Sequence, residues 1–177
     1  MRDRRDERAE PTQAVLGALL HKAWNCVRAE DPSLADYIGN NRSDKLERAA
    51  VFRLALYLDS LIKSQSWVGF ESLTVDVELA RQDGGDPKLE AGESADIVVH
   101  RRGAAGPNLL AVECKPQATW GASDARDKDE KKLKRLTMSG PEDSGRPYAL
   151  GVRMRLVLSR ELGPEDLHWF ASGARIP

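Results

Sequence analysis

The chain has 177 residues, 41% of them hydrophobic, which suits a single domain with a sizeable core. Its 27 basic and 28 acidic residues leave a net charge of −1, which argues against a basic nucleic-acid tail and an acidic disordered polymer. No apolar run approaches the roughly 18 residues of a membrane-spanning helix. The N-terminus lacks the apolar core of a secretory signal, and two cysteines are too few for a disulfide framework. We therefore expect a cytoplasmic protein with no membrane partner.

Two amphipathic helices are predicted near the N-terminus. Residues 1–10 alternate in charge without an apolar cluster and are expected to be a flexible arm, leaving 11–177 as a single domain. From Pro11 to about residue 31, apolar residues recur on one helical face. A second such stripe spans 44–64, where Asp44 and Glu47 resemble a capping box.

The periodicity then changes to that of strands. Residues 73–79 alternate apolar and polar side chains, which predicts a half-buried strand, and 80–93 form a polar loop. A second strand is predicted over 96–102 and a third over 108–115. The short link at 103–107 favours antiparallel pairing between them.

The C-terminal part predicts a helix, a strand and a helix. Residues 124–137 are rich in helix formers, 139–145 form a loop, and 148–158 alternate as a fourth strand. A short final helix is expected after Gly163 and Pro164. The predicted fold is α/β (α+β), a three-layer core with a central mixed four-stranded sheet flanked by helices. Its order is αβββαβ, with an extra N-terminal helix.

Three ionisable residues occupy positions that favour chemistry. Glu113 and Lys115 share one face of the third strand while Cys114 points to the other, and antiparallel pairing would bring Asp96 opposite them. Two carboxylates and a backbone carbonyl, that of Cys114, suit Mg²⁺, and Mn²⁺ is a possible substitute. The lysine would orient a water or stabilise developing charge.

An isolated Glu-x-Lys on a strand is usually a solvated charged face. The preceding residues 109–112, however, are apolar on both faces, as in a buried central strand. Charges at the end of such a strand cost desolvation free energy unless a partner or a metal ion is present. This cost favours a functional role for the three residues together.

The element order and the pattern Ser94, Ala95, Asp96, then Glu113, Cys114, Lys115, resemble the PD-(D/E)xK nuclease superfamily with its restriction-endonuclease-like fold. The local sequence is similar to small uncharacterised bacterial members. The resemblance implies that Asp96 and Glu113 are metal ligands and that Lys115 is the catalytic lysine. It also implies a supporting role for Glu47 from the first core helix. Ser94 and Ala95 depart from the family motif, which has proline immediately before the aspartate.

The helix at 124–137 carries residues with two possible roles. Lys131, Lys132 and Arg135 are candidates for phosphate contact, although a salt-bridged solvent face also explains them. Asp129 and Lys132 are alternatively partners of Lys115.

These features predict a metal-dependent phosphodiesterase that hydrolyses nucleic acid through a metal-activated water. DNA is the expected substrate. No base-reading motif is visible, so a homodimer, a protein partner or DNA shape is expected to supply specificity. The alternative is a catalytically inactive nuclease-like scaffold that binds protein or nucleic acid.

Overall fold

The computed structural model describes residues 12–32, 34, 44–65, 72–77, 94–101, 108–138, 147–157 and 160–177. The predicted arm at 1–10 and the predicted loops at 80–93, 103–107 and 139–145 lie outside the described residues. The side chain of Asp44, and with it the predicted capping box, also lies outside them.

Three helices match the sequence predictions closely. They are α1 (Gln13–Glu30), α3 (Asp44–Ser64) and α4 (Ser123–Thr137). Thr12 caps α1, since its side-chain oxygen accepts a hydrogen bond from the Val15 N–H. None of the described helices combines the length and apolar character that crossing a bilayer requires.

The described strands form one mixed sheet of six. They are β1 (Thr74–Val77), β2 (Ile97–His100), β3 (Asn108–Pro116), β4 (Tyr148–Leu156), β5 (Leu167–Ala171) and β6 (Ala174–Ile176), and they lie side by side in chain order. Neighbouring strands are antiparallel except β3 and β4, which are parallel and are connected through α4. The α/β class and the mixed sheet are as predicted.

The predicted four-stranded sheet and its element order are wrong at the C-terminus. Pro164–Asp166 form only a short 3₁₀ turn, and two strands follow it where a helix was expected. In strand β5, side chains alternate across the sheet, so Trp169 packs in the core on the α1 side and Phe170 packs in the core on the α4 side. A strand buries both aromatic rings because the sheet has a helix layer on each face.

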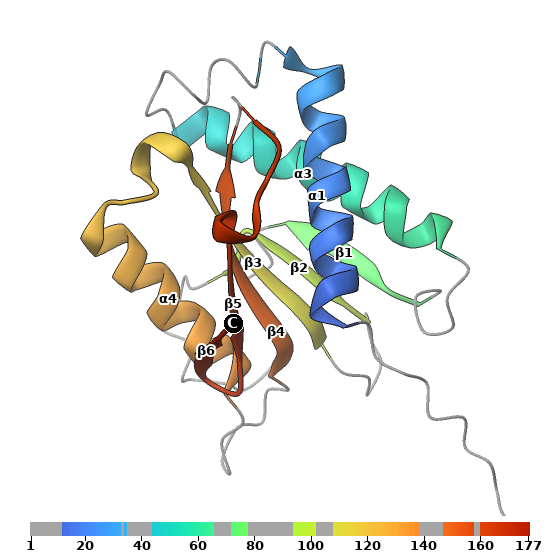
Figure 1. Cartoon of the computed structure of the whole chain (residues 1–177). Coiled ribbons are helices and arrows are strands. Elements are labelled where there is room, and N and C mark those ends of the chain that lie inside the picture. The colour runs from blue at the N-terminus through green and yellow to red at the C-terminus, as the bar shows by residue number, and fades with distance from the viewer. Residues whose placement is uncertain are drawn as a thin grey trace, which may run out of the picture.

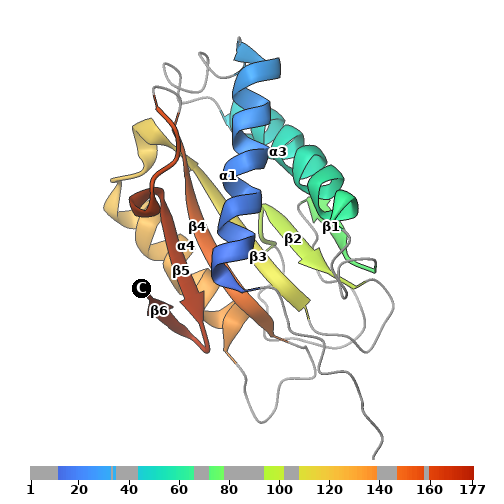
Figure 2. The ribbon, with the colours of Figure 1, turned by 45° about the vertical axis from the view of Figure 1, so that its right-hand side comes forward.

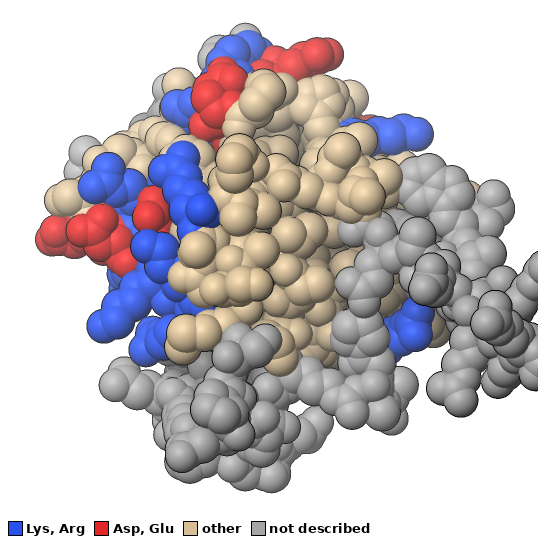
Figure 3. Space-filling model, turned by 60° about the horizontal axis from the view of Figure 1, so that its bottom comes forward, with Lys and Arg blue, Asp and Glu red and all other residues tan. Residues whose placement is uncertain are grey.

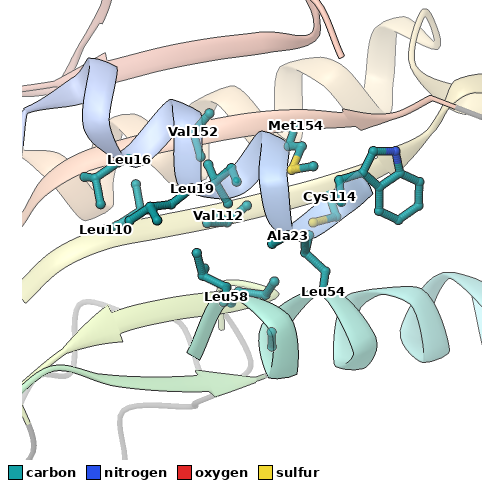
Figure 4. Packing of buried hydrophobic residues seen from close by; sticks show 14 of the residues in the cluster. Leu16, Leu19, Ala23, Leu54, Leu58, Leu110, Val112, Cys114, Val152 and Met154 are labelled. Carbon is teal, nitrogen blue, oxygen red and sulfur yellow. The ribbon is translucent and has the colours of Figure 1, made fainter. Parts of the chain in front are cut away.

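The sheet lies between two helix layers. Helices α1 and α3 cover one face and α4 covers the other, as Figure 1 and Figure 2 show from two directions. Figure 4 shows side chains of α1 and α3, including Leu19 and Leu54, meeting Val112, Cys114 and Met154 of the central strands. Because Cys114 points into this apolar layer, Glu113 and Lys115 point to the opposite face.

A smaller core fills the α4 side. Leu133 and Leu136 of α4 pack against Ala111 and Phe170. Gly151 of β4 allows the close approach, since a Cβ there would lie 3.1 Å from the Thr137 methyl group and 3.2 Å from a Leu133 methyl group. Helix α4 therefore lies directly above the face that carries Glu113.

Candidate active site

The register of β2 and β3 brings Asp96 to the carboxyl end of β3. Ile97 pairs with Val112, so Asp96 lies immediately beyond the last pair of the ladder. There its Oδ2 accepts a hydrogen bond of 2.7 Å from the Cys114 N–H. Residues 18 positions apart in sequence thus meet at one point of the sheet.

Glu113 is buried beneath α4, with 1% of its surface exposed. Its Oε1 accepts a hydrogen bond of 2.7 Å from Lys132 Nζ, and the same ammonium donates to the Ser94 carbonyl at 3.1 Å. The Glu113 carboxylate is therefore held between strand and helix.

Burial raises the pKa of both carboxyl groups. For Glu113, loss of solvation and the nearby Asp96 charge raise the pKa to about 8, against the opposing effect of Lys132. For Asp96, burial raises the pKa although the Cys114 N–H stabilises the charged form. Both carboxyl groups have reduced solvation, and the Asp96 charge opposes the ionisation of Glu113, so an additional cation would stabilise the ionised pair.

Lys115 approaches the site from the end of the same strand. Its Nζ lies 3.1 Å from Oε1 of Glu47, in the first turn of α3. Burial disfavours the charge of Lys115, but Asp129, Glu47 and Asp96 outweigh burial and raise its pKa. Lys115 is thus a cation at neutral pH, anchored by Glu47. The structure places Glu47 against the Lys115 ammonium.

The donor set fits a hard divalent cation such as Mg²⁺. Asp96 Oδ1 and Glu113 Oε2 have no hydrogen-bond partner among the described residues. The Cys114 carbonyl points to the same edge of β3 as its N–H, hence toward Asp96. Within the described part of the chain, no three His, Cys, Asp or Glu side chains gather as a metal group. Proteins usually bind Mg²⁺ through one or two carboxylates, and water and substrate phosphate complete the coordination. The oxygens of Asp96 and Glu113 are consistent with this arrangement.

A second buried ion pair lies beside the site. Arg153 is the neighbour of Glu113 on β4, and its Nε donates to Asp129 Oδ2 of α4 at 3.1 Å. The guanidinium also donates to the Trp120 carbonyl and lies 4.0 Å from the centre of the Trp120 ring. Asp129, one of the possible partners of Lys115, forms this hydrogen bond with Arg153 and acts on Lys115 through its charge. The spacing of Asp129, Leu133 and Leu136 was the signal that Asp129 faces the sheet.

The three α4 residues expected to contact phosphate do not lie together. Lys132 points inward to Glu113, and its side chain is 13% exposed. Lys131 and Arg135 instead line a surface hollow of about 300 Å³ with Asp127, Glu130, Lys134 and Met138. Figure 3 shows basic and acidic side chains mixed on the side where α4 lies rather than a uniformly basic patch. The geometry of Lys132 therefore fits an internal partner better than an exposed phosphate contact.

The fold and this cluster define an α/β protein with a buried glutamate, a partly buried aspartate and an anchored lysine at the carboxyl end of a central strand. No family model, no curated protein and no solved structure matches the chain.

Proposed function

We propose that the protein is a divalent-metal-dependent phosphodiesterase of the PD-(D/E)xK type that hydrolyses nucleic acid, with DNA as the substrate. The observation that carries the proposal is the convergence of partly buried Asp96 and buried Glu113 next to a charged Lys115, each carboxylate having one oxygen without a partner among the described residues. Placing two carboxylates side by side with little solvent destabilises a fold, and a bound cation would offset this cost.

The proposed roles follow from the positions of the side chains. Asp96 and Glu113, with the Cys114 carbonyl, would hold the cation, which when bound would polarise the phosphate and lower the pKa of a coordinated water. Lys115 directs its ammonium to the attacking water or to the charge that develops on the phosphate oxygens. Glu47 fixes the orientation of Lys115 through their hydrogen bond.

The near-neutral net charge and the mixed charges on α4 support no broad electrostatic DNA surface. The proposal therefore assigns affinity to the site itself and to a second subunit or protein partner.

Cleavage assays with matched variants test the proposed function. Plasmid, linear and single-stranded DNA are incubated with Mg²⁺, Mn²⁺ or EDTA. Lys115→Met and Asp96→Asn are each expected to lower the cleavage rate by about 10²–10³-fold. The matched controls are Lys63→Met and Asp127→Asn, whose side chains are 65% and 70% exposed, and these should cleave like the wild type.

The assay also separates the alternative function. Cleavage that persists in Lys115→Met and Asp96→Asn would contradict the proposed site. DNA binding without metal-dependent cutting, unchanged by either substitution, would favour the inactive scaffold.

A further inference from the structure

Lys132 joins the two segments that carry the candidate metal ligands. Its Nζ donates to Glu113 Oε1 at 2.7 Å and to the Ser94 carbonyl at 3.1 Å. Glu113 belongs to β3, and Ser94 lies two residues before Asp96. One ammonium group on α4 is thus bonded to both ends of the candidate site.

The inward position of Lys132 follows from the phase of α4. Leu133 and Leu136 anchor the helix on the sheet, and Lys132 lies beside them, three residues after Asp129. Asp129 pairs with Arg153 in the same helix–sheet interface. The neighbouring pair fixes the rotation of α4 and so the direction of the Lys132 side chain.

The hydrogen bond from Lys132 distinguishes the two oxygens of Glu113. Oε1 is occupied, whereas Oε2 has no partner among the described residues. A ligating carboxylate that is hydrogen-bonded through its other oxygen is held in one orientation, which improves metal affinity.

We propose that Lys132 is a positioning residue: it orients Glu113 so that Oε2 faces a divalent cation, and it ties the Asp96 segment to the same point. The inference rests on the proposed function. Lys132 would thus support metal binding, whereas the sequence alone made it a candidate for phosphate contact.

Mn²⁺ titration calorimetry tests the inference without measuring activity. Lys132→Met is expected to lower Mn²⁺ affinity by about 10- to 100-fold. By Coulomb's law alone, removal of a positive charge would raise the affinity for a cation, so a loss identifies the orienting role. The loss should be larger for Mg²⁺, because Mg²⁺ demands near-ideal octahedral geometry.

A second variant retains the charge. Lys132→Arg keeps a cation opposite Glu113 and is expected to fold, but the longer planar guanidinium moves the donors. Its Mn²⁺ affinity should fall by about 10-fold, near the lower end of the same range. Wild-type affinity in either folded variant would overturn the positioning role.

Thr137→Ala is the control for a loosened helix. Thr137 is the last residue of α4, and its Oγ1 accepts a hydrogen bond from the Gly173 N–H. This variant should therefore lower stability and leave Mn²⁺ affinity unchanged.

Glu113→Gln separates the positioning role of Lys132 from the proposed function. If it binds Mn²⁺ as the wild type does, or if the wild type binds none, both proposals fail. If Glu113→Gln loses binding while Lys132→Met does not, only the positioning role fails.

Discussion

The backbone N–H of Cys114 donates to Asp96 Oδ2 at 2.7 Å, so a carboxylate joins β3 to the segment that precedes β2. The next residue, Ile97, begins the regular ladder by pairing with Val112. The same side chain is thus a structural acceptor and a candidate metal ligand. Substitutions that preserve only one of these properties can separate its two roles.

Asp96→Asn and Asp96→Ala are expected to differ in stability but not in activity. Asparagine retains an acceptor for the Cys114 N–H, whereas alanine leaves a buried N–H without one, at a cost of about 1–3 kcal/mol. Both changes remove the negative charge and should lower metal-dependent cleavage by the same factor of about 10²–10³. Urea unfolding in EDTA measures the first difference, and equal stability of the two variants would contradict the structural role of the hydrogen bond.

The convergence of Asp96, Glu113 and Lys115 was predictable because two simple rules determine it. Side-chain alternation sets the face of β3, and the short link between β2 and β3 sets the antiparallel register. The partner of Glu113 was harder to predict, because Lys132 lies in a run of basic residues that resembles a solvated surface. Its inward direction depends on where α4 packs, although Leu133 and Leu136 carried that information.

Glu113 is expected to make the metal-free protein less stable as pH rises. Its pKa is about 8 in the folded protein and near the ordinary 4.5 in the unfolded chain, because burial raises it only in the fold. Between these values the folded protein binds more protons, so the free energy of unfolding falls as pH increases. The contribution has a slope of up to about 1.4 kcal/mol per pH unit and is constant above the folded pKa.

Glu113→Gln isolates this effect, since glutamine keeps an acceptor for Lys132 but does not titrate. Urea unfolding at several pH values between 5 and 9, in EDTA, should show the variant gaining stability relative to the wild type as pH rises. Parallel pH profiles for the two proteins would show that Glu113 has no raised pKa.

Breaking the Asp129–Arg153 pair should be strongly destabilising. Arg153 is fully buried and Asp129 is 5% exposed, so removing one partner leaves a buried charge without its hydrogen-bonded partner. Arg153→Met or Asp129→Leu alone should cost about 3–5 kcal/mol, and the double variant should recover much of the loss. A double-mutant cycle by urea unfolding measures the coupling. Additive single effects would mean that the two charges do not stabilise each other.

The C-terminal hairpin escaped prediction because its signals are short and ambiguous. Pro164 is typical of a helix start, and Leu167, Trp169 and Phe170 fit a single helical turn as well as a strand. The turn between β5 and β6 is Ser172 and Gly173, a weaker hairpin signal than Asn-Gly. Strand pairing with β4 decides the outcome, and that contact is not visible in the local sequence.

Gly173→Ala tests the turn between β5 and β6. Ser172 and Gly173 have φ angles of 49° and 75°, and Ala171 pairs with Ala174, as in a two-residue turn with both central φ angles positive. Alanine at Gly173 would adopt a disfavoured φ, and its Cβ would lie 3.3 Å from Met138 Cβ. We expect a loss of about 1–2 kcal/mol in urea unfolding. Ser172→Asn is the matched control and should be neutral or stabilising, because asparagine tolerates positive φ. A stability gain in Gly173→Ala would therefore contradict the hairpin.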